Sequence, residues 1–117
     1  MRKTLLTILC LLLSAALCAQ SEVTVVKKPV KLLQNDGEYY MKPVWSPDGR
    51  KLAFTSARYT GLYVISADGR DLMQVTDEAA AGYAFQWSSD SRALLTRVAH
   101  YDGPYRYNAV KVFDLAT

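Results

Sequence analysis

The sequence repeats one turn motif after 42 residues, and this repeat limits the folds open to the chain. Residues 45–52 read Trp-Ser-Pro-Asp-Gly-Arg-Lys-Leu, and residues 87–94 read Trp-Ser-Ser-Asp-Ser-Arg-Ala-Leu. The same shift aligns Val30 with Leu72 and Leu33 with Val75. A period of about 40–45 residues with four short strands per unit is typical of propeller blades. The repeat therefore predicts an all-β fold made of propeller-like blades.

The first copy of the motif predicts a tight hairpin. Pro47 has a fixed φ that suits the first central position of a turn, and the Asp48 side chain can accept backbone N–H groups. Gly49 can adopt the positive φ that a three-residue hairpin loop requires. We expect a second turn of this kind at Asp68 and Gly69. In the first hairpin we expect Trp45 to be buried, because its large apolar ring favours removal from water.

Strand and turn patterns divide the rest of the chain. We expect residues 1–19 to be a signal peptide, residues 20–29 a lead-in segment, and residues 30–117 a partial propeller. Within the propeller, we assign residues 30–34 to a strand that closes a ring, residues 40–76 to blade one, and residues 83–117 to an incomplete blade two. Strands are expected at residues 40–46, 50–56, 62–66, 71–76, 83–87, 92–98 and 110–114.

Blade two differs from blade one in two ways. Residues 112–113 align with residues 64–65 only at a shift of 48, so six extra residues fall within residues 100–107. Such insertions are expected to be loops, and they gather on functional faces. The fourth strand of this blade has no counterpart before Thr117. We therefore expect an incomplete, truncated propeller of about two blades. With one sheet face and one strand edge uncovered, the chain should not behave as a well-folded monomer, because exposed strand edges template pairing with other chains.

Residues 45–56, followed by Leu-Tyr-Val-Ile-Ser-Ala-Asp-Gly at residues 62–69, resemble the WD40-like PD40 repeat of TolB-type β-propellers. The resemblance extends over residues 30–117. The second repeat departs from it, with Ser89 in place of proline and Ser91 in place of glycine. The resemblance implies a non-catalytic periplasmic module of the Tol-Pal kind, whose partner is an envelope lipoprotein or membrane protein.

Two other kinds of protein carry similar blades. The N-terminal propeller of prolyl-oligopeptidase-type serine peptidases is one, and there the propeller gates access to a hydrolase domain. In that case the catalytic domain would lie outside this chain. The other is a blade array in an outer-membrane-linked or carbohydrate-active protein. A Gly-x-Ser-x-Gly segment encoded downstream would favour the peptidase.

The N-terminus has the pattern of a secretory signal. Arg2 and Lys3 precede an apolar stretch at residues 5–17, and Ala19 provides a small residue for cleavage before Gln20. The apolar stretch is shorter than a typical membrane span, so no transmembrane segment is expected in the mature chain. A lipoprotein signal that uses Cys18 is an alternative, but the bulky Leu17 fits it less well. These features predict a periplasmic protein.

Charge and cysteine content restrict the chemistry. Both cysteines, Cys10 and Cys18, lie in the expected signal peptide, so the mature chain has no thiol for a disulfide or a metal site. Loss of Arg2 and Lys3 lowers the net charge from +3 to +1. This balance gives no reason to expect a nucleic-acid partner.

Few side chains suit catalysis. His100 is the only histidine, and no Gly-x-Ser-x-Gly nucleophile elbow occurs. His100 and Asp102 provide too few ligands for a metal. The turn carboxylates Asp48, Asp68 and Asp90 are explained by hydrogen bonds within their turns. We therefore predict no catalytic residue, no metal and no cofactor.

Tyrosine is the residue type that points to binding. In a four-stranded blade, the Asp-Gly-Arg turns lie at one end and most tyrosines at the other. Tyrosine offers a large contact area and a polar tip at low entropic cost, which binding surfaces favour. Tyr40 and Tyr83 can instead pack beneath the loops. The candidate binding face therefore comprises Tyr59, Tyr101, Tyr105, Arg106 and Tyr107.

Overall fold

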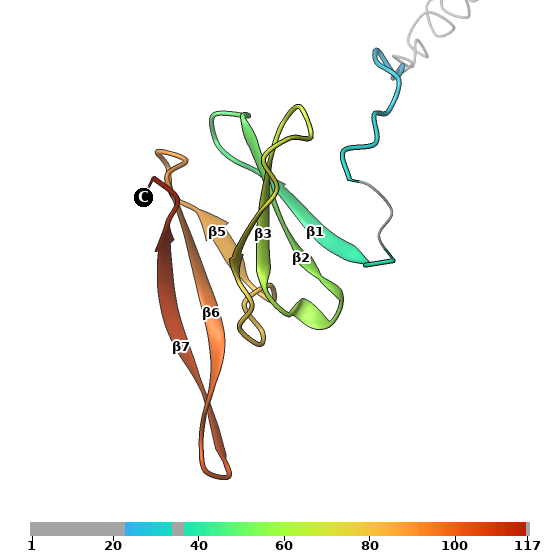
Figure 1. Cartoon of the computed structure of the whole chain (residues 1–117). Coiled ribbons are helices and arrows are strands. Elements are labelled where there is room, and N and C mark those ends of the chain that lie inside the picture. Colours follow the sequence, from blue (N-terminus) through green and yellow to red (C-terminus); the bar gives the residue numbers. More distant parts are fainter. Residues whose placement is uncertain (1–22, 34–36, 117) are drawn as a thin grey trace, which may run out of the picture.

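The computed structural model describes residues 23–33 and 37–116, and the prediction of an all-β fold is confirmed (Figure 1). The chain forms two antiparallel sheets, neither of which is closed. Sheet A has the order β1-β2-β3-β4 and sheet B the order β5-β6-β7. Their strands are β1 (Tyr40–Trp45), β2 (Lys51–Ser56), β3 (Leu62–Ser66), β4 (Met73–Thr76), β5 (Phe85–Trp87), β6 (Ala93–Asp102) and β7 (Tyr105–Asp114). The expected signal peptide lies outside the described residues.

The first hairpin turn has the predicted geometry. Gly49 has a φ of 69°, and its N–H donates to the carbonyl oxygen of Ser46 over 2.9 Å. The Ser46 hydroxyl donates to the Asp48 carboxylate over 2.6 Å, and that carboxylate accepts the N–H of Arg50. The N–H of Lys51 in turn donates to the Ser46 hydroxyl. The serine before the aspartate therefore connects the two sides of the turn.

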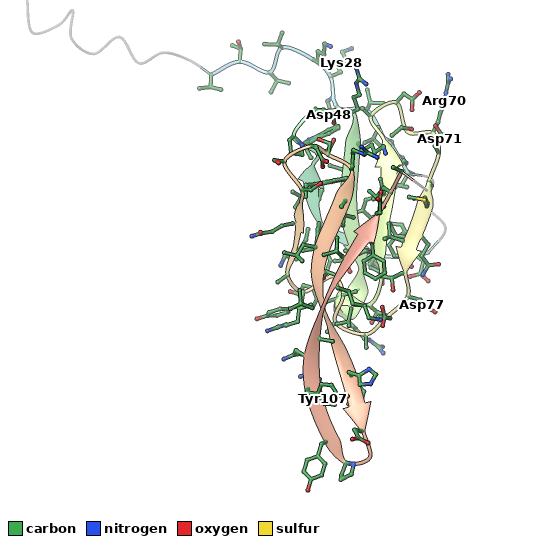
Figure 2. All side chains as sticks on the ribbon, turned by 90° about the vertical axis from the view of Figure 1, so that its left-hand side faces the viewer. Lys28, Asp48, Arg70, Asp71, Asp77 and Tyr107 are labelled. Atoms are coloured by element: carbon green, nitrogen blue, oxygen red, sulfur yellow. The ribbon has the colours of Figure 1, made fainter. Side chains whose placement is uncertain are left out.

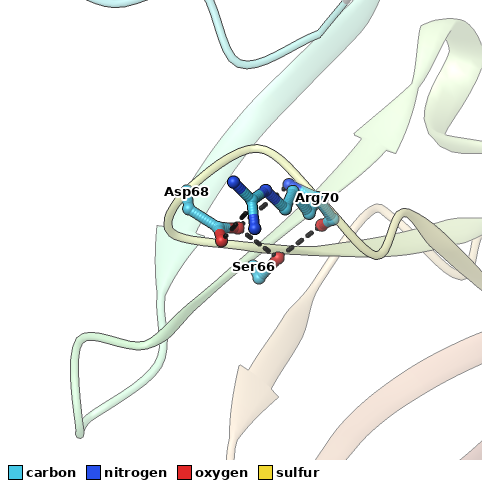
Figure 3. A network of polar contacts seen from close by, with 3 residues as sticks. All are labelled: Ser66, Asp68 and Arg70. Atoms are coloured by element: carbon cyan, nitrogen blue, oxygen red, sulfur yellow. Dashed lines mark hydrogen bonds and ion pairs between the residues drawn. The ribbon is translucent and has the colours of Figure 1, made fainter.

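This serine–aspartate turn occurs three times in the part of the chain that the structure describes. Figure 3 shows the second example, in which the Ser66 hydroxyl donates to Asp68 over 2.8 Å and Asp68 accepts the N–H of Arg70. In the third, Ser88 and Asp90 make the same contacts. Where the first two turns have Gly49 and Gly69, the third has Ser91, with a φ of 62°. The degenerate second repeat thus keeps the geometry of the first despite its different residues.

Ser91 also joins the two sheets, because its hydroxyl accepts the N–H of Asp48 over 3.1 Å and its side chain is buried. We therefore expect Ser91→Ala to lower the free energy of unfolding by about 1–2 kcal/mol, since the bond is lost and the positive φ remains. Ser91→Gly should cost less, because glycine relieves the backbone strain. Urea denaturation of both variants measures the difference. Equal losses would mean that strain at this position is negligible.

The two sheets pack face to face around one apolar core. Sheet A contributes Ala53, Leu62 and Val64, and sheet B contributes Leu94 and Val98; all five are at most 3% exposed. Strand alternation places Ala53 on the face of sheet A that meets sheet B, and Leu94 on the face of sheet B that meets sheet A. We call these the front face of sheet A and the back face of sheet B.

The two repeated tryptophans differ in their surroundings. Trp87 packs against the core, and its Nε1 donates across the sheets to the carbonyl oxygen of Val44 over 3.1 Å. Trp45 is 53% exposed, so the prediction that it is buried was wrong. Its ring lies on the other face of sheet A from Ala53, because its partner Leu52 precedes Ala53 in β2. It stands at the end of the edge strand β1, whereas Phe54 and Ile65, in the central strands of the same face, are buried.

Glycine at position 82 allows the sheets to approach closely. A Cβ atom at Gly82 would lie 1.8 Å from Oγ1 and 2.2 Å from Cβ of Thr55. Thr55 is fully buried, and its hydroxyl donates to the carbonyl oxygen of Gly61 over 2.8 Å. The N–H of Gly82 donates to the carbonyl oxygen of Tyr59. The connection between the sheets is therefore held directly against β2.

Apart from β4 and β5, which each begin two residues later than expected, the structure departs from the expected strands in three places. Residues 30–33, the described part of the expected closing strand, are irregular, and Val30 is 79% exposed. A strand needs a neighbouring ladder to pair its backbone groups, and these residues join neither sheet. β1 contains an irregularity between Met41 and Val44, where Lys42 has a φ of 53°. The third departure is in β6 and β7, which continue through the expected loop at residues 100–107.

In the described part of the chain, no helix is long and apolar enough to cross a membrane.

Candidate functional site

The insertion at residues 100–107 forms the end of a long hairpin, not the loop that the sequence suggested. β6 and β7 pair without interruption from Ala93 and Asp114 to Asp102 and Tyr105. The loop is Gly103-Pro104, with a φ of 56° at Gly103, as a two-residue hairpin loop requires. Six extra residues therefore lengthen the ladder, because each added pair satisfies two backbone donors or acceptors. We call residues 99–108 the arm.

The arm extends away from the rest of the molecule (Figures 1 and 2). In Figure 2 the labelled Tyr107 lies on the arm, while Asp48 and Arg70 mark two of the serine–aspartate turns at the opposite end of the molecule. The turns and the arm tyrosines thus occupy opposite ends, as the strand order predicts. Of the candidate residues, four are on the arm: Tyr101, Tyr105, Arg106 and Tyr107.

Strand alternation divides these four residues between the two faces of the arm. Tyr101 is paired with Arg106, so both side chains are on one face. Tyr105 and Tyr107 are on the other, and there the His100 ring packs against Tyr107 with 5.0 Å between ring centroids. Tyr101, Tyr105 and Tyr107 are 62%, 75% and 49% exposed. The arm therefore presents aromatic side chains in two directions.

Tyr59 belongs to a separate cluster. It ends the short 3₁₀ helix η2 (Ala57–Tyr59), and its ring meets that of Tyr83 edge to face at 5.4 Å. Lys42 Nζ is 5.4 Å from the Tyr59 ring centroid and donates to the carbonyl oxygen of Tyr83 over 2.7 Å. The Arg97 guanidinium is over the Tyr83 ring, 4.8 Å from its centroid. Two cations thus hold two tyrosines together where β2 ends.

Lys42 and Arg97 were not among the candidate residues predicted from the sequence. The signal for Arg97 was present, since a charged residue stands inside an expected strand where the first repeat has Thr55. Its Nε atom is buried and, among the described residues, has no hydrogen-bond partner, so the Tyr83 ring is the contact that stabilises its charge. Lys42 gave no such signal, because its position depends on the irregularity in β1.

A charged pair anchors the base of the arm. Lys111, on β7, donates to the Glu78 carboxylate over 2.5 Å, and Thr76 also donates to Glu78. The bond from Lys111 is the main reason that the pKa of Glu78 lies below its ordinary value. This pair ties β7 to the connection between the sheets, and so fixes the direction of the arm.

The three turn aspartates share one electrostatic property. The pKa values of Asp48, Asp68 and Asp90 lie below the ordinary value, chiefly because the serine two residues earlier donates to each carboxylate. A lowered pKa in the folded state adds stability above the unfolded pKa, and that stability is lost as the pH falls through the folded pKa.

We therefore expect the melting temperature to fall as the pH drops below about 4, the ordinary pKa of an aspartate. A variant with Asp48→Asn, Asp68→Asn and Asp90→Asn should show a weaker dependence, because the three groups no longer titrate. Thermal melts between pH 6 and pH 2.5 measure both slopes. Identical slopes would mean that other carboxylates govern acid unfolding.

Among the residues that the structure describes, no group of three or more His, Cys, Asp or Glu side chains is arranged to hold a metal ion.

Comparison with known proteins gives one partial match. Over 64 residues the chain is 38% identical to the "Uncharacterized peptidase YuxL" of Bacillus subtilis (strain 168). The match covers 52% of this chain and 10% of that protein, so the chain corresponds to about a tenth of the relative's length. No family model matches the chain, and no solved structure matches it.

Proposed function

We propose that this chain forms two blades of a β-propeller domain that acts as a non-catalytic module of a peptidase. The observation that carries the proposal is the face-to-face stacking of two antiparallel sheets whose first turns repeat the same serine–aspartate contacts. Stacked sheets with a repeated turn are the building plan of a propeller. The partial similarity to a protein named as a peptidase supports the second half of the proposal.

The arm supplies the contact surface in this proposal. By resemblance to prolyl-oligopeptidase-type enzymes, the propeller controls the entry of substrates and leaves the chemistry to a hydrolase domain. The exposed tyrosines of the arm lie at the end opposite to the serine–aspartate turns, where a second domain or a peptide can approach. The Tol-Pal type of envelope function, with a lipoprotein partner, stays a prediction, as do the signal peptide and the periplasmic location.

A chimera tests the proposal. The 64 matched residues of the Bacillus peptidase are replaced by those of this chain, and the product is assayed for a cooperative melt and for hydrolysis of peptidyl p-nitroanilides. If the segments are equivalent blades, the chimera should fold and keep at least about a tenth of the parent activity, a loss of roughly 1.4 kcal/mol in transition-state stabilisation. A chimera with a shuffled segment of the same composition is the matched control, and should neither fold nor hydrolyse the substrate.

Two outcomes would contradict the proposal. One is a chimera that behaves like the shuffled control, because the segments would then not be equivalent. The other is hydrolysis by this chain alone that His100→Ala abolishes, since His100 is the only histidine and a non-catalytic module does not need it. Against such hydrolysis, the His100 ring packs against Tyr107 on the arm.

A further inference from the structure

Sheet B has one face that sheet A does not cover. Leu95, Val110 and Val112 lie on this face, which we call the front face of sheet B, and they are 42%, 72% and 66% exposed. A hollow of about 200 Å³ on it is lined in part by Leu95, Arg97 and Val110. Contiguous exposed apolar side chains of this kind mark interaction surfaces.

The internal repeat indicates what covers such a face. Leu95 follows Ala53 by 42 residues, and Val112 follows Val64 by the shift of 48 that the longer hairpin introduces. Ala53 and Val64 form the front face of sheet A, and the back face of sheet B buries them. The exposed face of sheet B is therefore the repeat equivalent of a face that is buried by the back of a following sheet.

A sheet with the matching back face is present in every copy of the chain. On sheet A, Trp45 and Leu52 stand at the positions that Trp87 and Leu94 occupy on the back face of sheet B. Phe54 and Ile65 of the same face are already buried, whereas Trp45 is 53% exposed. Trp87 donates across the interface to the carbonyl oxygen of Val44. The repeat equivalent of that acceptor is the carbonyl oxygen of Gln86, at the edge of the exposed face.

We propose that a second copy of this chain packs through the back face of its sheet A onto the front face of sheet B, with Trp45 in the role of Trp87. The contact joins two different surfaces, so it is head-to-tail and can add further copies. Arg97 stands on this face where sheet A has Thr55, and its guanidinium lies over the Tyr83 ring. The assembly goes beyond the proposed function, since it concerns copies of this chain and not the peptidase.

The first test is light scattering of the chain as it is purified from the cells that express it. Its mass should rise with concentration to two or more copies. Val112→Asp and Trp45→Arg should each raise the concentration at half-assembly by at least about tenfold, because each would place an unpaired charge in the contact. The matched controls are Val30→Asp and Tyr39→Arg, at exposed positions outside the strands, and they should leave assembly unchanged.

Mixing the two variants tests the head-to-tail geometry. Val112→Asp chains keep an intact back face on sheet A, and Trp45→Arg chains keep an intact front face on sheet B. An equimolar mixture should therefore form dimers that do not grow, although neither variant assembles alone. In a Trp87→Phe chain, where Trp45 is the remaining tryptophan, emission should shift to the blue as the concentration rises.

Three results would overturn the proposal. The first is a chain that stays monomeric over the whole concentration range. The second is assembly that Val112→Asp abolishes but Trp45→Arg leaves intact, because two front faces of sheet B would then meet each other. The third is an equimolar mixture that stays monomeric. None of these results bears on the chimera, so the two proposals can fail independently.

Discussion

Gly82→Ala is expected to destabilise the protein by at least about 3 kcal/mol, which a chain of this size can hardly tolerate. The added methyl group would lie 1.8 Å from Oγ1 and 2.2 Å from Cβ of Thr55. Thr55 is fully buried in β2, so its side chain has no space into which to move. To avoid this overlap, the connection at Gly82 would have to move away from β2. This movement would break the hydrogen bond from the Gly82 N–H to the Tyr59 carbonyl oxygen and open the core. Urea denaturation followed by tryptophan fluorescence measures the loss.

Gly103→Ala is the matched control, because it makes the same chemical change in open space. Nothing lies within 4 Å of a Cβ atom at Gly103, and only its φ of 56° resists the substitution. The expected cost is about 1 kcal/mol, that of one residue in the left-handed region. If the two variants lost the same stability, the close approach of Gly82 to Thr55 would not matter for folding.

Leu94→Ala is expected to lower the free energy of unfolding by about 3 kcal/mol, whereas Leu95→Ala should lower it by less than about 1 kcal/mol. The two leucines are neighbours in β6 and point to opposite faces. Leu94 is fully buried against sheet A, and Leu95 is 42% exposed. Truncation of Leu94 leaves a cavity between the sheets, and truncation of Leu95 leaves none.

Denaturation below the concentration of self-association measures both leucine variants, so that the contact proposed for Leu95 between copies does not contribute. The opposite order of effects would mean that β6 turns its other face to sheet A. Because Leu94 and Leu95 are adjacent in the chain, this pair of variants tests which face of β6 packs against sheet A.

Local features of the sequence predicted local structure well. The turn at Gly49 follows from residues 47–49, whereas the positive φ of Ser91 is known only from the structure, because serine is a poor residue for that region. These features depend on neighbours within a few residues, and the backbone preferences of proline, aspartate and glycine determine them.

Features that depend on distant segments could not be predicted in this way. Trp45 and Trp87 have the same local sequence, yet Trp45 is half exposed and Trp87 packs against the core, because distant segments surround them differently. The pairing of residues 100–107 depends on whether β6 and β7 stay in register over ten residues each. The cluster of Lys42, Tyr59 and Tyr83 brings together three segments far apart in the chain. The pattern of side chains along the sequence does not show which distant segments lie close together in the fold.

The order of the two sheets along the chain has a consequence for synthesis. Sheet A is complete at Thr76, but its front face is buried by the connection and by sheet B, which come later. At translation rates of about 5–20 residues per second, Ala53 and Val64 stay uncovered on the ribosome for some seconds. A nascent chain that pauses after β4 would present a finished sheet with a bare apolar side. The translation rate of the codons for residues 77–98 therefore determines how long a chaperone has to protect this apolar face.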